Sequence, residues 1–190
     1  MEWLARLLGR DGATLADIAA PIVPGSSLFL PHLQGERAPL WDISLRGTFA
    51  GLTAATGPAE MAAAVMEGVA FSARLALEAL QRAGDVVPAS LRVGGGGMAS
   101  DRWCQIRANA LNRRLERVSG KDPGAVGAAL MTGLGCSAMA NLAEAAERLV
   151  KVDRIFTPDP AMAALSDVRF TLWRDLILGA RSVNARLAKS

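Results

Sequence analysis

The stretch VGGGGMASDRW, residues 93–103, decides the fold that we predict for this 190-residue chain. Consecutive glycines follow a short apolar run that ends at Val93, and a polar, helix-compatible segment follows them. Glycine loses more backbone freedom on folding than other residues, so such a run is costly to order. A strand, a glycine-rich turn and a helix let the backbone approach a nucleotide closely, because free N–H groups and the helix dipole attract negative charge. A plain tight turn is the alternative, since the stretch is neither a P-loop nor a GxGxxG fingerprint.

Strands and helices are expected to alternate on both sides of these glycines, which predicts an α/β domain. The expected strands cover 28–33, 47–52, 90–93 and 115–118, and the expected helices cover 3–8, 58–83, about 100–115, 123–135, 142–149 and 162–187. We expect Gly9 and Gly12 to end the first helix, and FTPDP, residues 156–160, to form a turn. The small residues of PGAVGAALMTGLG, residues 123–135, favour close contact between that helix and a sheet.

Composition excludes several classes of protein. Hydrophobic residues make up 51% of the chain and charged residues 21%, which indicates a globular domain. The formal net charge of +3 comes from basic residues scattered among acidic ones, so we expect no nucleic-acid partner. No apolar run approaches the ~18 residues of a membrane span, and no signal-peptide core opens the chain, so we expect no membrane association. The separated Cys104 and Cys136 fit a reducing, cytoplasmic location.

Four segments resemble, in order, the motifs of the FGGY family of carbohydrate kinases. GTFAGLTAATGPAEMAAAVMEG, residues 47–68, is similar to the second family signature, a Gly-x-aromatic-x-Gly-aliphatic core, a spacer and an apolar helix that ends in an acidic residue. The other segments are FLPHLQGERAPLWDISLRG at 29–47, GGGGMASDRWCQI at 94–106 and PGAVGAALMTGLG at 123–135. Several motifs in order are far more specific than any one alone, and together they extend over most of the chain.

The resemblance implies an actin-like, ribonuclease-H-like ATPase fold, a mixed sheet flanked by helices. It covers only the C-terminal, nucleotide-binding domain of the family, so residues 1–190 are expected to lack the N-terminal domain with the sugar site and the catalytic aspartate. The helix that opens the chain without a capping sequence suggests the same. The parent enzyme would transfer the γ-phosphoryl group of ATP, with Mg²⁺, to a sugar or polyol. Its motifs look most like those of xylulokinases, while ribulokinase-like and glycerol-kinase-like members stay open.

The resemblance also implies a set of ATP-binding residues, namely Gly95, Gly96, Gly97, Ser100, Asp101 and Glu2. Some family members carry asparagine at the position of Asp101. Aspartate can accept a hydrogen bond from a ribose hydroxyl but cannot donate one, and its charge would repel phosphate. The alternatives are a helix cap for Asp101 or Ser100 and a frayed terminal residue for Glu2. We expect no catalytic residue and no metal ligand in this chain, so the chain alone should be inactive.

Other conspicuous residues have a structural and a functional interpretation. The loop residues Glu36, Arg37, Asp42 and Arg46 form either an internal ion-pair network or a cleft-facing loop that helps domain closure. His32, the only histidine, is expected to be packed rather than catalytic, and Arg107, Arg113, Arg114 and Arg117 to form a solvated face. Trp173, Leu176 and Ile177 indicate packing, with a homodimer contact as the alternative. A second hypothesis for the whole chain is a stand-alone nucleotide-binding or interaction module without turnover.

Overall fold

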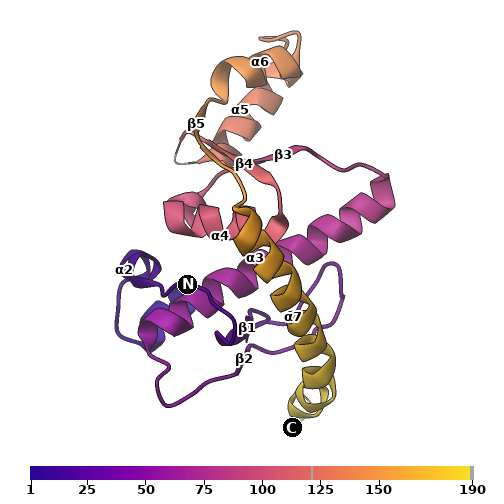
Figure 1. The fold of residues 1–190 in the computed structure, drawn as a ribbon. Coiled ribbons are helices and arrows are strands. Elements are labelled where there is room, and N and C mark those ends of the chain that lie inside the picture. The colour runs from indigo at the N-terminus through magenta and orange to yellow at the C-terminus, as the bar shows by residue number, and fades with distance from the viewer. Residues whose placement is uncertain (121, 189–190) are drawn as a thin grey trace.

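The computed structural model describes residues 1–120 and 122–188, and Figure 1 shows its ribbon. The elements of this part of the chain are, in order, α1 Glu2–Leu7, α2 Gly12–Ile18, β1 Leu28–Leu30, β2 Thr48–Ala50, α3 Pro58–Gly84, β3 Ser90–Val93, a 3-10 turn Gly96–Met98, α4 Asp101–Leu111, β4 Arg114–Val118, α5 Pro123–Gly135, α6 Leu142–Leu149, β5 Val152–Phe156 and α7 Pro160–Leu187. Proline occupies the first position of α3, α5 and α7, where its fixed φ suits a helix and its missing N–H costs nothing.

A mixed three-stranded sheet carries the glycine stretch. β3 pairs in parallel with β4, from Ser90 opposite Arg114 onward, and β4 pairs antiparallel with β5. Parallel neighbours need a crossover connection, and α4 supplies it. The contact between α4 and the sheet is a small buried cluster formed by Cys104, Ala108, Leu115 and Phe156. The predicted α/β class is therefore confirmed, and the glycines lie at the end of β3, where the chain turns toward α4.

The other half of the molecule is built on the long helix α3. β1 and β2 form an antiparallel pair, with Phe29 opposite Phe49, and β1 lies directly on α3. A side chain at Gly68 would collide with the backbone carbonyl of Phe29, so this close approach requires glycine. α1 and α2 cover the first turns of α3 and bury Leu4 and Leu15 completely (Figure 1).

Helix α7 ties the two halves together, because it packs against both α4 and β1. Trp173 is fully buried, its ring centroid lies 5.9 Å from those of Phe71 and Phe170, and its Nε1 donates to the Phe29 carbonyl at 2.9 Å. Ile177 is buried as well. The packing interpretation of this part of α7 is confirmed.

Several predicted boundaries are wrong. The helix expected to reach residue 115 ends at Leu111, because Asn112 adopts a left-handed conformation with φ of 47° and the next strand begins at Arg114. Gly12 is the first residue of a second helix, α2, and does not only follow the end of the first helix. The carboxylate of Asp11 caps α2 by accepting a hydrogen bond from Thr14 N at 2.8 Å. The unpredicted β5 ends at Phe156, directly before the turn, and its exposed charged residues hid the strand pattern.

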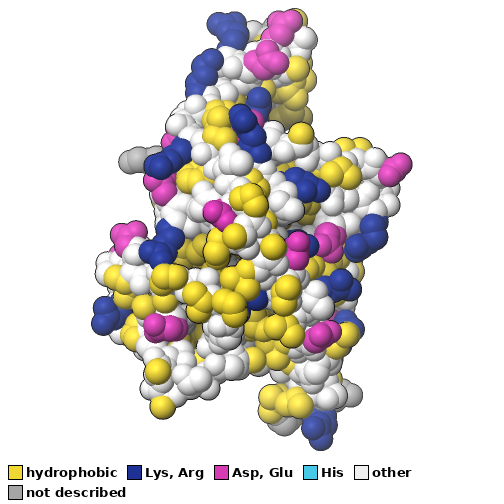
Figure 2. Space-filling model, viewed as in Figure 1, with side chains coloured by type: hydrophobic (Ala, Val, Ile, Leu, Met, Phe, Trp, Pro, Cys, Tyr) yellow, Lys and Arg dark blue, Asp and Glu magenta, His cyan; other side chains and the backbone are white. Residues whose placement is uncertain are grey.

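Helix α5 also differs from its prediction. It packs mainly against α6 rather than against the sheet, and Leu130 is its only buried residue. The pair α5–α6 stands apart from the rest of the ribbon, at the top of Figure 1. On the face drawn in Figure 2, hydrophobic side chains gather over the lower centre, while basic and acidic side chains are interspersed around it. No helix within the described residues is long and apolar enough to cross a membrane.

Candidate functional site

The glycine stretch forms a tight turn between β3 and α4. Gly95 has a φ of +93°, a conformation that side chains rarely adopt. The 3-10 turn Gly96–Met98 follows, closed by hydrogen bonds from Met98 N to Gly95 O at 2.9 Å and from Ala99 N to Gly96 O at 3.2 Å. Helical first turns leave their leading amides free, and the N–H groups of Gly96 and Gly97 have no hydrogen-bond partner within the described residues.

The consecutive glycines differ in why the structure requires, or does not require, glycine at each position. A Cβ on Gly94 would lie 2.6 Å from Pro123 and 2.8 Å from Val118, so Gly94 permits a close approach between chain segments, whereas Gly95 supplies the positive φ. At Gly96 an added Cβ would meet nothing within 4 Å. Neither packing nor a left-handed φ therefore requires glycine at this position.

A cavity of about 640 Å³ opens beside this turn. We call it the glycine-turn cavity, and its lining residues are Met1, Glu2, Gly12, Ala13, Ala16, Asp17, Gly96, Gly97, Ala99, Ser100 and Trp103. Its volume falls within the ~300–1,000 Å³ typical of small-molecule sites. One wall comes from α1 and α2 and the other from the turn and the start of α4. Four of the predicted site residues, Glu2, Gly96, Gly97 and Ser100, are thus brought together.

The lining of this cavity suits a nucleoside better than a triphosphate. It combines an indole, alanine methyl groups and bare glycine backbone with the acidic side chains Glu2 and Asp17. Within the described residues no lysine or arginine side chain lines it, so its side chains offer phosphate groups no charge-assisted donor. Carboxylates can accept hydrogen bonds from ribose hydroxyls or an exocyclic amine.

Gly95 and Asp101 lie outside the lining of the glycine-turn cavity. Gly95 borders a second cavity of about 530 Å³, together with Gly96, Arg117 and Asp153. Gly96 therefore borders both cavities.

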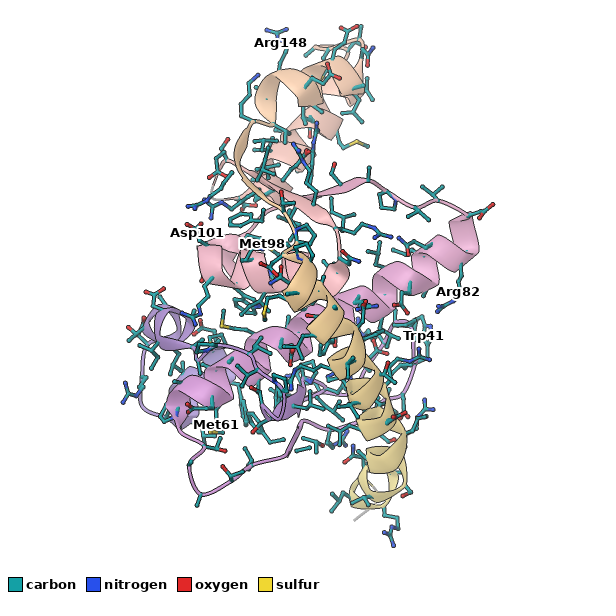
Figure 3. All side chains as sticks on the ribbon, viewed as in Figure 1. Trp41, Met61, Arg82, Met98, Asp101 and Arg148 are labelled. Atoms are coloured by element: carbon teal, nitrogen blue, oxygen red, sulfur yellow. The ribbon has the colours of Figure 1, made fainter. Side chains whose placement is uncertain are left out.

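Asp101, shown beside Met98 at the start of α4 in Figure 3, forms ion pairs with Arg117 at 2.8 Å and with Arg154. The helix-cap interpretation of Asp101 is wrong, because Ser100 is the cap and its Oγ accepts from Trp103 N at 3.3 Å. The predicted ATP contact of Asp101 remains a prediction.

Two arginines hold the carbonyl groups of the turn. Arg107 is buried, and its guanidinium donates to Gly97 O at 2.9 Å. Arg117 donates to Met98 O at 3.2 Å and to Asp153 at 3.0 Å, and the aspartates Asp153 and Asp101 raise its pKa above the ordinary value. The prediction that this basic run forms a solvated face is wrong for Arg107, and Arg117 is only partly exposed. Spacing alone could not find them, because their partners lie on the turn and on β5.

The charged loop between β1 and β2 is held largely by its own backbone. Glu36 accepts from Leu40 N at 2.9 Å, Arg46 donates to the carbonyls of Ile43 and Leu45 at 2.9 Å, and Asp42 forms an ion pair with Arg181 of α7 at 2.8 Å. The predicted internal ion-pair network is therefore wrong: within the described residues no ion pair joins Glu36, Arg37, Asp42 and Arg46 to one another, and hydrogen bonds to the loop backbone and the pair with α7 hold the loop instead. Trp41, labelled in Figure 3, lies exposed in this loop.

His32 is packed, as predicted. It is 5% exposed, its ring centroid lies 5.9 Å from that of Trp173, and its Nε2 has no hydrogen-bond partner within the described residues. Burial lowers the pKa of His32 below its ordinary value.

A buried ion pair lies at the end of the signature segment. Arg169 of α7 donates to both carboxylate oxygens of Glu67 in α3, at 2.8 and 2.6 Å, and also to the carbonyls of Ser26 and Ser27. Burial raises the pKa of Glu67, and the arginine opposes that shift. The pair joins α7, α3 and the segment before β1.

The residues of α2 are the largest part of the cavity that the sequence interpretation missed, and Met1, Ala99 and Trp103 were missed as well. Gly12, Ala13, Ala16 and Asp17 line it. Asp11 could have indicated the start of α2, because aspartate is a common helix cap and a short apolar pattern follows it. Gly12, directly after Asp11, indicates the end of the preceding helix instead.

Comparison with known proteins identifies relatives over most of the chain. The family model described as "FGGY family of carbohydrate kinases, C-terminal domain" matches residues 3–136. A xylulose kinase of Bacillus subtilis (strain 168) is 30% identical over 169 residues, which are 89% of this chain and 34% of that protein. A glycerol kinase of Thermococcus gammatolerans is 37% identical over 130 residues, which are 68% of this chain and 26% of that protein.

A solved structure extends this result to the fold. The ligand-bound xylulose kinase from Lactobacillus acidophilus superposes with a TM-score of 0.83 at 27% identity, covering 98% of this chain and 38% of that one. The predicted actin-like ATPase fold is confirmed. The chain spans about a third of the length of the curated relatives it matches.

Proposed function

This chain belongs to the FGGY family of carbohydrate kinases and corresponds to the C-terminal domain of that family. On that premise we propose that it supplies the nucleoside-binding half of an ATP-dependent sugar kinase. The observation that carries the proposal is the glycine-turn cavity, where Glu2, Gly96, Gly97 and Ser100 meet. The open space at Gly96 and its free N–H fit a flat ligand that lies against bare backbone. The proposal concerns residues 1–190 as one nucleotide-binding domain.

In this proposal the base and ribose occupy the glycine-turn cavity and the phosphates point away from it. The acidic side chains Glu2 and Asp17 accept from hydroxyl or amine groups of the nucleoside, and the alanine and indole surfaces exclude water from the base. Asp101, which lies outside the lining of the cavity, has its charge balanced by Arg117 and Arg154, and this reduces its repulsion of the phosphates.

Mg²⁺, which neutralises the transferred phosphoryl group in kinases, is assigned no ligand in this chain. The described residues contain no cluster of three or more His, Cys, Asp or Glu side chains that could hold a metal ion. We assign the metal, the sugar and the catalytic base to an N-terminal domain, so this chain contributes positioning of the nucleotide. Alone it should therefore not turn over substrate, and we place the enzyme in the cytoplasm.

The acceptor that we propose is a pentulose such as xylulose. Xylulose kinases and glycerol kinases both occur among the curated relatives and among the superposed structures, but the superposed xylulose kinases from Lactobacillus acidophilus and Brucella ovis are 27% and 30% identical to this chain, whereas the glycerol kinase from Plasmodium falciparum is 22% identical. Glycerol is the competing acceptor, and rates with the two compounds in the complete enzyme would decide between them.

The experiment that tests the nucleotide site uses the ¹⁵N-labelled chain titrated with MgATP and followed by amide chemical shifts. We expect the amides of Gly96, Gly97 and Ser100 to shift with a dissociation constant weaker than ~1 µM, equivalent to about −8.2 kcal/mol, because the charge-assisted phosphate contacts are elsewhere. The amides of Gly127 and Gly135 on α5, and a parallel titration with xylulose, are the controls. Shifts confined to other regions, or no shifts at saturating MgATP, would contradict the proposal.

A further inference from the structure

The buried guanidinium of Arg107 contacts both parts of the cavity wall that α4 and the turn provide. It donates to Gly97 O at 2.9 Å, and it lies over the Trp103 ring with 4.5 Å between the guanidinium carbon and the ring centroid. Gly97 and Trp103 both line the glycine-turn cavity. Arg107 itself does not line it, so the arginine lies behind the wall.

The surroundings of Arg107 are unusual for a buried cation. It is 8% exposed, and within the described residues it forms no ion pair with a carboxylate. Its partners are a carbonyl, the Met98 thioether at 2.8 Å and an indole face. A buried charge without a counter-ion is expensive, so this arrangement makes the Gly97 carbonyl its principal polar partner. A charge-assisted hydrogen bond of this kind is short and strong.

The turn needs such a restraint, because glycine has the largest conformational freedom in the unfolded and the mobile chain. A carbonyl held by a fixed donor orients its peptide plane and therefore the neighbouring amides. Arg117 and the Cys104 thiol hold the next carbonyl, Met98 O, at 3.2 and 3.3 Å. Order that is present before binding lowers the entropy lost on binding and so raises affinity.

We propose that Arg107 is a positioning residue that preorganises the glycine turn and the Trp103 ring for the nucleoside. The proposal rests on the proposed function, because it deepens the account of the same cavity. It assigns to this arginine an effect on ATP affinity without any contact with ATP.

The test compares Arg107→Met and Arg107→Lys with Arg114→Met in the 190-residue chain. Methionine removes the charge and retains a long, apolar side chain, and lysine keeps the charge but loses the planar stacking group. Arg114 is the matched control, since it carries the same charge, is exposed and pairs with Glu116 at the surface. Hydrogen exchange of the turn amides and ATP titration followed by amide shifts are measured for each variant.

We expect Arg107→Met to speed exchange of the Met98 and Ala99 amides, which are the hydrogen-bonded amides of the turn, by about tenfold or more, while exchange in β4 and α7 stays unchanged. ATP affinity should fall several-fold in Arg107→Met, less in Arg107→Lys and not in Arg114→Met. If Arg107→Met does not fold, Arg107→Lys carries the same comparison. Uniformly faster exchange across the chain, or an ATP affinity no weaker than that of Arg114→Met, would overturn the proposal.

The two proposals fail in different ways. If the unmodified chain shows no shifts with MgATP, the proposed function fails, and the exchange measurement still reports whether Arg107 orders the turn. If the unmodified chain binds ATP through the turn and Arg107→Met binds it equally well, the positioning role fails and the proposed function stands.

Discussion

Replacing Gly96 by valine is the sharpest perturbation that this structure offers. An added Cβ would have nothing within 4 Å, and φ at Gly96 lies outside the left-handed region, so the folded chain should accept the side chain. Replacing glycine at such a position also reduces the entropy of the unfolded chain, which favours folding by ~0.4–1 kcal/mol in the case of alanine. The melting temperature of Gly96→Val should therefore be unchanged or slightly higher.

The effect on nucleotide binding should be large by comparison. The isopropyl group would project into the space that borders both cavities at the turn. If it keeps the nucleoside off roughly 60 Å² of apolar wall, the loss is ~1.5 kcal/mol at ~25 cal/mol per Å², which is about tenfold in affinity. In a kinase that contains this chain together with a sugar-binding half, we expect the KM for ATP to rise at least about tenfold. The KM for the sugar should change much less.

Two further variants make the comparison interpretable. Gly127→Val on α5 places the same side chain at another open glycine, and it should leave both Michaelis constants unchanged. Gly96→Ala should give a smaller rise in the KM for ATP, because its side chain is smaller. A folded Gly96→Val enzyme with an unchanged KM for ATP would refute the nucleotide role of the turn and reduce the glycines to a chain reversal.

Three other predictions concern stability and activity. Arg169→Met should lower the free energy of unfolding by ~3–5 kcal/mol in urea titrations, because it leaves the buried Glu67 carboxylate unpaired. Adding Glu67→Gln to this variant should recover part of the lost stability. Equal stability of the single and the double variant would contradict this prediction. Burial lowers the pKa of His32 in the folded chain below the ordinary 6.5 of the unfolded chain. The stability that neutral His32 contributes to the folded state is therefore fully present above pH 6.5 and is lost as the pH falls toward the folded-state pKa. The melting temperature of the unmodified chain should therefore fall between pH 7.5 and 5.5, and that of the His32→Phe variant should fall less. Identical pH profiles of the two melting temperatures would disprove this role of His32. The 190-residue chain alone should release no ADP from ATP with xylulose in a coupled assay, and turnover that survives repurification would show that a complete active site lies within it.

Much of this protein is determined by signals that are local in the sequence. The run ending at Val93, the glycines and Ser100 predict strand, turn and helix, because φ preferences and capping act within a few residues. Proline and glycine mark the bounds of α3 correctly for the same reason. The ordered motifs also suffice for the family, which the family model confirms over residues 3–136.

The tertiary structure alone decides which distant residues meet. Glu2 and Ser100 share a cavity only because α1 and α2 pack beside α4, and no spacing in the sequence encodes that contact. Arg107 stands in a basic run that resembles a solvated face, yet its burial depends on the turn carbonyl and the indole that the fold places beside it. β5 and the pairing of Asp153 with Arg117 escaped prediction likewise, because a strand at the sheet edge owes its conformation to its neighbour rather than to its own residues. Local preferences fix the elements, and long-range packing fixes the environment, charge and partners of each side chain, which are the properties that make a site.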